Sequence, residues 1–432
     1  MTEPPKFYAA ADGWCRRGTV VSAQRMLVNV RIPACRPGWL VKIHARGGQA
    51  FARVRSSSAI NATCELLVER AGVGPGDVVE CDGAEMGAFV GGGICGAETD
   101  AWGDGVDDAQ HGRFVAMSAP PPPSARDRVA IDRTLQTGIA AIDLFATLGY
   151  GQRIALFAGA GVGKSSLLRR IVAHARVDAR VVALIGERGR EARETADALR
   201  ATRAWPTTTI VCAPAGSPAP ERVAALHTAT AQAEWLRSRG LDVLLVVDSL
   251  TRTAHAMREL ALAGGESPAQ RGYPPSVTAD LSAAVERTGA IGNGTITAVY
   301  AVLVDGDDRT EPVSDAIRGM LDGHIVLDRA IADAGRFPAI DVLRSLSRLM
   351  PTLATQQHRR DAALGRRALD ALERARDLFA LGAYQPGGDP WLDAAVSIRD
   401  QLESLVHDGD AEAGDDAFAR LRAIACALET VA

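Results

Sequence analysis

The segment Arg153-Ile-Ala-Leu-Phe-Ala-Gly-Ala-Gly-Val-Gly-Lys-Ser-Ser-Leu-Leu168 decides the fold of this chain. It opens with an apolar run, residues 154–157, that is typical of a buried parallel strand. Alternating glycines, a lysine and two serines follow, and apolar residues then recur at helical spacing. A strand, a glycine-rich loop, Lys-Ser and a helix in this order predict a phosphate-binding loop.

The residue types in this loop have physical reasons. Glycines let backbone N–H groups turn inward around a phosphate, and the positive end of the following helix faces the anion. We expect Lys164 to contact the β- and γ-phosphates of ATP and Ser165 to offer its hydroxyl to Mg²⁺. The strict pattern has glycine at position 158, but alanine needs only an ordinary φ, so Ala158 lets the loop form. The predicted nucleotide-binding residues of the loop are Gly159, Ala160, Gly161, Val162, Gly163, Lys164, Ser165 and Ser166.

Composition narrows the class of protein. A length of 432 residues favours more than one domain. The net charge of −4 argues against a generally basic nucleic-acid surface. The 7 cysteines are scattered without a C-x-x-C pair, so we predict neither a zinc site nor a disulfide framework, in keeping with a reducing cytosol. Neither a signal peptide nor a membrane-spanning segment is predicted.

The chain divides into four predicted regions. Short β-prone runs between Gly and Pro residues predict a small barrel-like N-terminal domain over residues 1–112, in which we expect residues 88–108 to be irregular. A run of four prolines marks residues 113–130 as a linker. Residues 131–350 alternate strands and helices, which predicts an α/β domain with a parallel sheet covered by helices. Residues 351–432 are predicted to form a C-terminal helical domain.

Two carboxylates are expected at the nucleotide-binding edge of that sheet. Asp248 ends the apolar run 243–247, the Walker B arrangement, where it can hold Mg²⁺ beside Ser165. Glu187 follows the predicted strand that ends at Ile185, and there it can orient and polarise an attacking water. The alternatives are an Asp that caps the next helix and a solvated charge run that opens a helix.

Eight segments, taken together and in order, resemble the type III secretion ATPases of the injectisome and flagellar export branches. These proteins are relatives of the catalytic subunit of rotary ATP synthases. The resemblance is dense between Arg126 and Pro351 and implies a RecA-like ATPase core. The segments are Thr137–Asp143, Gly151–Ser165, Ile185–Glu191, Val247–Arg252, Arg271–Ser276, Glu311–Arg318, Leu321–Leu327 and Pro338–Pro351.

The resemblance implies further roles for single residues. Glu187 matches the water-activating glutamate, Arg188 its neighbour at the γ-phosphate, and Asp248 the Walker B aspartate. Arg348 matches the arginine finger that reaches into the neighbouring subunit's site; the alternative is a surface or intrasubunit salt-bridge arginine. Phe337 matches the aromatic that packs on adenine, where base stacking contributes ~1–3 kcal/mol; the alternative is a core aromatic.

The resemblance also implies a function. It predicts a homohexameric ring that hydrolyses ATP with Mg²⁺ and energises protein unfolding and export through a type III apparatus, with the injectisome favoured over the flagellum. Expected partners are a central stalk, regulatory stator proteins and chaperone–cargo complexes, with no nucleic acid. The expected location is the cytoplasm, at the periphery of the bacterial inner membrane and its export gate.

Two other functions compete with this one. The first is a non-catalytic nucleotide-binding scaffold subunit of a rotary-type assembly, which Glu187 argues against because such subunits usually lack that carboxylate. The second is an RNA-translocating, terminator-like hexamer, which the acidic net charge and the low aromatic content of 5% argue against.

Overall fold

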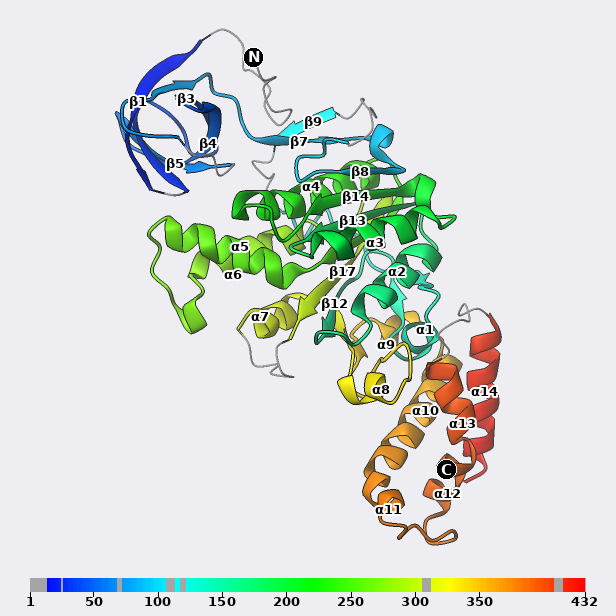
Figure 1. Cartoon of the computed structure of the whole chain (residues 1–432). Coiled ribbons are helices and arrows are strands. Elements are labelled where there is room, and N and C mark those ends of the chain that lie inside the picture. Colours follow the sequence, from blue (N-terminus) through cyan, green and yellow to red (C-terminus); the bar gives the residue numbers. More distant parts are fainter. Residues whose placement is uncertain are drawn as a thin grey trace.

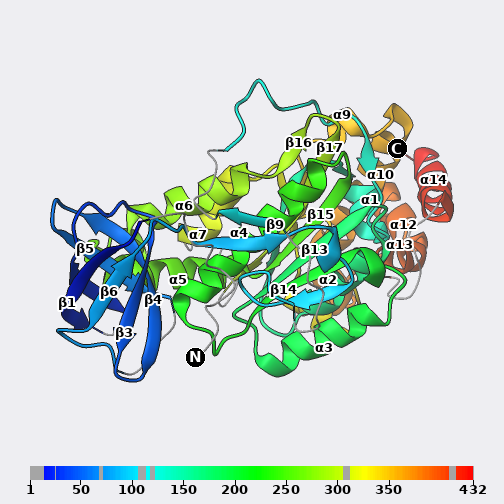
Figure 2. The same cartoon turned by 90° about the horizontal axis from the view of Figure 1, so that it is seen from above.

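The computed structural model describes residues 14–24, 26–67, 72–105, 113–116, 122–304, 312–407 and 415–431. An N-terminal barrel and a C-terminal group of helices lie at opposite ends of a central sheet that is flanked by helices (Figures 1 and 2). The predicted fold class, a parallel-sheet core between a small barrel and a helical domain, is confirmed. None of the helices in the described ranges is long and apolar enough to cross a membrane.

The barrel closes in the strand order β1-β2-β5-β4-β3-β6. Its inward side chains form a core of small aliphatic residues and cysteines, as the alternation of strand side chains requires. Closure leaves no free strand edge at this end of the molecule. The strands are β1 (Arg16–Gln24), β2 (Leu27–Arg31), β3 (Leu40–Ala45), β4 (Gly48–Ser57), β5 (Asn61–Leu66) and β6 (Val78–Cys81).

The segment after the barrel contradicts our expectation of an irregular stretch over residues 88–108. β7 (Gly87–Val90) pairs with β9 (Arg113–Ala116). Between them in the chain lie a short 3₁₀ turn, η1 (Gly92–Ile94), and the strand β8 (Ala97–Thr99). β8 extends the edge of the central sheet, where it pairs with β14 (Thr208–Ala213). The expectation was wrong because a strand of three residues carries no periodic signal, and its partner lies more than a hundred residues away.

The linker region also contacts the central domain. Arg128 donates a hydrogen bond of 3.0 Å to the carbonyl of Thr288 and forms an ion pair of 2.6 Å with Glu286. Two of the four prolines, at 120 and 121, lie outside the described residues. The end of the predicted linker, at Arg128 and Val129, therefore contacts the central domain at Ala290 and Ile291.

The central sheet has the order β19-β18-β12-β17-β15-β13-β14-β8, with β16 paired to β17. Its inner strands are parallel, whereas β19 and β16 pair antiparallel with their neighbours. The predicted strand that ends at Ile185 and the apolar run 243–247 are present as β13 and β15. The strands not yet given are β12 (Arg153–Ala158), β13 (Ala179–Ile185), β15 (Asp242–Asp248), β16 (Gly289–Ile291), β17 (Gly294–Leu303), β18 (Gly323–Val326) and β19 (Leu346–Ser347), with β10 (Thr134–Leu135) and β11 (Leu148–Gly149) in a separate pair.

Helices cover both faces of this sheet. Because strand side chains alternate, Leu156 faces one core and Phe157 the other. The helices are α1 (Ala140–Phe145), α2 (Lys164–His174), α3 (Gly189–Arg200), α4 (Ala219–Arg237), α5 (Leu250–Ala263), α6 (Pro275–Glu286), α7 (Pro312–Met320) and α8 (Arg329–Asp333), with 3₁₀ turns η2 (Trp205–Thr207) and η3 (Gln270–Gly272).

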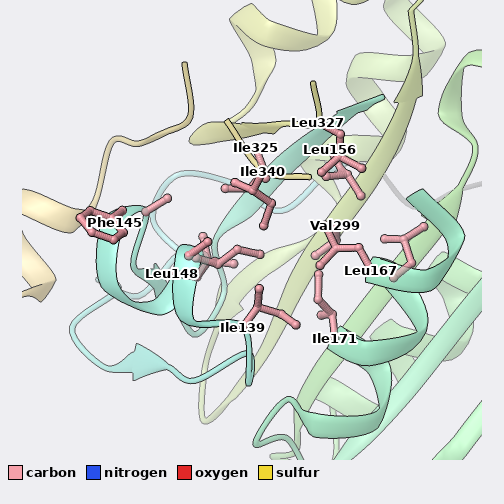
Figure 3. Packing of buried hydrophobic residues seen from close by; sticks show 14 of the residues in the cluster. Ile139, Phe145, Leu148, Leu156, Leu167, Ile171, Val299, Ile325, Leu327 and Ile340 are labelled. Atoms are coloured by element: carbon pink, nitrogen blue, oxygen red, sulfur yellow. The ribbon is translucent and has the colours of Figure 1, made fainter. Parts of the chain in front are cut away.

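Each terminal part shares a core with one face of the sheet. Leu156 and Ile325 pack with Ile139 and Leu167 (Figure 3), and this core continues into the C-terminal helices through Leu402. Phe51 of the barrel belongs to the core of the opposite face, under α4 and α5. The C-terminal helices are α9 (Met350–Leu353), α10 (Gln356–Arg374), α11 (Arg376–Ala380), α12 (Pro390–Ser397), α13 (Arg399–Val406) and α14 (Asp415–Glu429).

Candidate functional site

The loop between β12 and α2 has the conformation that its glycines predict. Gly161 has φ +79° and Gly163 φ +91°, in the left-handed region that side chains disfavour. Gly163 is the N-cap of α2 and offers no capping side chain, so the first N–H groups of the helix are left to a ligand. Ala160 and Gly161 are exposed, as are Ser165 and Ser166 in the first turn of α2, whereas Val162 is buried. The chain thus presents an open anion-binding loop.

Three charged side chains that lie far apart in sequence meet behind this loop. Lys164 Nζ lies 2.9 Å from Glu187 Oε1 and also contacts Asp248 Oδ1. The three residues stand at the carboxyl ends of the parallel strands β12, β13 and β15, where the sheet brings them together. Lys164, Glu187 and Asp248 are 8%, 6% and 4% exposed, so their charges interact with little screening by water.

The two carboxylates respond differently to their surroundings. Burial raises the pKa of Glu187, but the opposing charge of Lys164 and of Arg252 outweighs it, and the net pKa lies below the ordinary value. Burial raises the pKa of Asp248, and the nearby charge of Glu187 adds to that rise against the attraction of Lys164. Glu187 is therefore ionised at neutral pH, as a water-activating base must be.

Arg252 is a site residue that the sequence analysis missed. Its Nη1 lies 3.0 Å from Glu187 Oε2 and also donates to the carbonyl of Gly186. Ser249, the N-cap of α5, directs this first helical turn toward the strand ends. The signal was present in the sequence, since an arginine four residues after a strand-end aspartate falls on the first turn of the next helix.

Phe337 and Arg329 approach the loop from the segment after β18. Phe337 is 44% exposed, unlike a core aromatic, and a Cβ built on Gly163 would lie 3.4 Å from two of its ring carbons. Arg329, which the sequence analysis also missed, donates a 3.0 Å hydrogen bond to the carbonyl of Ala160. An exposed aromatic face therefore stands beside the phosphate loop.

Arg188 and Arg348 lie away from the charged cluster. The side chain of Arg188 is 82% exposed and pairs at 3.4 Å with Glu191. The backbone N–H of Arg348 donates to the carbonyl of Asp322, at the start of β18 and beside Arg153, the first residue of β12. The phosphate loop follows the other end of β12, and at roughly 3.3 Å per residue the strand separates the two by about 17 Å.

The exposed side chain of Arg348 makes no ion pair or hydrogen bond within the described part of the chain. Arg348 thus lies too far from its own phosphate loop to contact it.

Comparisons with known proteins first define the class of protein. Residues 138–347 match the nucleotide-binding domain of the ATP synthase alpha/beta family, and residues 354–422 match the T3SS EscN ATPase C-terminal domain. These two matches, together with the phosphate loop and the carboxylates behind it, identify the chain as an ATP-hydrolysing enzyme of the ATP synthase alpha/beta family.

Individual relatives then narrow the family. The flagellum-specific ATP synthase of Bacillus subtilis is 40% identical, covering 93% of each chain. The SPI-2 type 3 secretion system ATPase of Salmonella typhimurium is 40% identical, covering 90% of each chain. The assembled ATPase EscN of the enteropathogenic E. coli type III secretion system superposes with a TM-score of 0.89 at 33% identity, covering 94% of this chain and 100% of that chain. The chain belongs to the family of type III secretion and flagellar export ATPases.

Replacing Gly163 by alanine tests the loop. A Cβ at φ +91° is strained, so Gly163→Ala should distort the loop and lower nucleotide affinity roughly ten-fold or more. Titration with a fluorescent ATP analogue measures this. Gly319→Ala is the matched control, because Gly319 lies exposed in α7 with no neighbour within 4 Å of the added Cβ. Equal affinity in both variants would contradict a role for the loop conformation in binding.

Proposed function

We propose that ATP is hydrolysed at the cluster of Lys164, Glu187 and Asp248, and that its energy drives protein export. The observation that carries this proposal is the buried ion pair between Lys164 and Glu187 behind an open phosphate loop. Lys164 binds the β- and γ-phosphates, whose charge draws its ammonium away from the carboxylates. Glu187, released from Lys164 and still held by Arg252, accepts a proton from the attacking water.

The residues beside the loop fit a Mg²⁺ ion that accompanies ATP. Ser165 is exposed in the first turn of α2, and Asp248 contacts Lys164, the residue before it; the hydroxyl and the carboxylate are both hard oxygen donors. Mg²⁺ bound there would neutralise phosphate charge. Asp248 then offers its carboxylate to the ion or to the ion's waters, and Lys164 remains available to the phosphates.

The remaining residues position the nucleotide. The exposed ring of Phe337 stacks on adenine, and Gly159 to Ser166 surround the phosphates with backbone N–H groups and the hydroxyl of Ser165. Arg188, free to swing from its exposed pair with Glu191, reaches the γ-phosphate. Arg252 keeps Glu187 oriented.

Lys164→Ala and Glu187→Gln should separate binding from chemistry. Lys164→Ala should lose both nucleotide affinity and turnover. Glu187→Gln keeps the side-chain shape and should bind ATP normally, while turnover falls by about 10²–10⁴-fold because a water-activating base is lost. Steady-state hydrolysis and nucleotide titration measure the two effects. Turnover near the native rate in Glu187→Gln would eliminate Glu187 as the base.

The ring completes the site. Arg348 lies beside the first residue of β12, whereas the phosphate loop follows the last residue of that strand. In a homohexamer it therefore contributes a guanidinium to the γ-phosphate in the neighbouring subunit. The similarity to the assembled EscN ATPase, which has also been solved in complex with its central stalk EscO, supports a ring with a stalk partner.

Mixing two inactive variants tests this sharing. Arg348→Ala should lose about 10³–10⁵-fold in turnover, the range for arginine fingers. Mixed with Lys164→Ala it should recover part of that activity, because some interfaces then pair an intact loop with an intact finger. Activity per subunit should also rise with protein concentration as rings assemble. Near-native turnover in Arg348→Ala, or no recovery on mixing, would place the arginine outside the active site.

The export role follows from the family. We propose that the ring works in the cytoplasm, peripheral to the inner membrane at an export gate, with stator proteins and chaperone–cargo complexes as partners. We favour the injectisome branch, because the match to EscN extends over the C-terminal helices, although flagellum-specific relatives reach 46% identity against 40% for the SPI-2 type 3 secretion system ATPase. Deleting the gene in its own host tests this: loss of effector secretion with retained motility supports the injectisome, and loss of motility contradicts it.

A further inference from the structure

A buried glutamine lies next to the segment that carries Arg348. Gln152 immediately precedes β12, and it is 0% exposed. Its side chain extends toward the hairpin of β18 and β19, and Arg348 is the residue that follows β19. The amide of Gln152 is therefore buried at the place where the sheet meets the backbone of Arg348.

Both the nitrogen and the oxygen of the Gln152 amide have partners. Its Nε2 donates a 3.0 Å hydrogen bond to Ser347 Oγ and one of 3.3 Å to the carbonyl of Asp322. Its Oε1 accepts a 2.9 Å hydrogen bond from the backbone N–H of Gly149. A single side chain therefore joins β11, the residue before β18, and β19.

The carbonyl of Asp322 is shared between Gln152 and Arg348. It accepts a hydrogen bond from the Gln152 amide and another, of 2.9 Å, from the backbone N–H of Arg348. The carboxylate of Asp322 is also held, because its Oδ2 accepts a 3.0 Å hydrogen bond from the backbone N–H of Arg153 and lies 3.3 Å from Arg153 Nε. The backbone of Arg348 is thus attached to a residue whose two polar groups both have partners.

The residues on both sides of Arg348 are held from the turn that contains Gln152. Before it in the chain, Ser347 is 3% exposed and its hydroxyl contacts Gln152. After it, α9 packs on β11, and a Cβ built on Gly149 would lie 2.8 Å from Leu353 Cδ1. Gly149 is also the residue whose N–H donates to Gln152, so one turn supports both flanks of Arg348.

A free side chain on a fixed backbone is the arrangement that an arginine finger needs. The Arg348 side chain is exposed and, within the described residues, makes neither an ion pair nor a hydrogen bond. A guanidinium stabilises transition-state charge only at the correct position, and misplacing a catalytic group by about 1 Å can cost roughly 10²-fold in rate. The contacts that fix the backbone of Arg348 therefore bear on turnover.

We propose that Gln152 is a positioning residue for Arg348, whose backbone it fixes through Ser347 and the carbonyl of Asp322. This role depends on the finger role that we propose for Arg348. Gln152 precedes β12, whereas the phosphate loop follows the other end of that strand. Loss of the Gln152 amide therefore impairs the finger that a subunit offers to its neighbour and leaves the subunit's own loop intact.

Gln152→Met in the full chain tests this role, because methionine keeps the length of the side chain and removes its hydrogen bonds. Turnover should fall roughly 10–10²-fold, while the KM for ATP stays within about two-fold because the loop is unchanged. Gln232→Met is the matched control. Gln232 is also 0% exposed, and its amide makes two hydrogen bonds, both to Gly91. Equal turnover in the two variants overturns the proposal.

Mixing experiments distinguish a defective finger from a defective loop. Mixed with Lys164→Ala, which still supplies an intact finger, Gln152→Met should recover turnover. Mixed with Arg348→Ala, which supplies no finger, it should show only the sum of the separate rates. Recovery with both partners means that the Gln152→Met finger works, and recovery with neither means that its own loop is damaged. Either result overturns the proposal.

Ser347→Ala provides the same test if Gln152→Met does not fold. It removes one hydroxyl and leaves the contact between Gln152 and Asp322, so it should recover with Lys164→Ala alone after a smaller loss of turnover. Near-native turnover in Arg348→Ala would overturn both the finger and the positioning role. If Arg348→Ala is inactive but Ser347→Ala recovers equally with both partners, the finger stands and only the positioning role fails.

Discussion

Everything in this molecule is arranged around one ammonium group held between two buried carboxylates. Lys164 contacts both Glu187 and Asp248, and Arg252 adds a second cation on the far side of Glu187. Each charge alone would be costly at this depth, but two cations and two anions balance one another. The triphosphate is an anion and Mg²⁺ is a cation. The triphosphate can therefore replace the carboxylates as the partner of Lys164, and Mg²⁺ can replace Lys164 as a partner of the carboxylates, so that no buried charge is left unpaired. In the mechanism that we propose, binding therefore frees the carboxylates for hydrolysis.

The sheet that holds this cluster also connects the two ends of the molecule. Its alternating side chains divide into two cores, one continuous with the barrel and the other with the C-terminal helices. β12 contributes to both and leads directly into the phosphate loop. The C-terminal helices also reach the nucleotide side, since His407 Nδ1 lies 2.9 Å from the carbonyl of Pro338, next to Phe337. Contacts at either end are thus joined to the site by continuous packing.

The length of a strand separates Arg348 from the phosphate loop of its own subunit. The loop lies after β12, and Arg348 lies beside the beginning of the same strand. If Arg348 acts in hydrolysis as we propose, it therefore acts at the site of a neighbouring subunit.

The sequence by itself determined what is local. The strand, glycines, Lys-Ser and helix of residues 153–168 form one contiguous unit, and apolar runs ending at Ile185 and Asp248 put carboxylates at strand tips, because these signals lie within a few residues of one another. The tertiary structure alone decided what depends on pairing between distant segments. Arg329 became a site residue only when the start of α8 was placed beside the phosphate loop, and β8 became a strand only beside β14. Gln152 met Ser347 only when β12, β18 and β19 joined one sheet, because no pattern in a linear sequence records which segments lie side by side in a sheet.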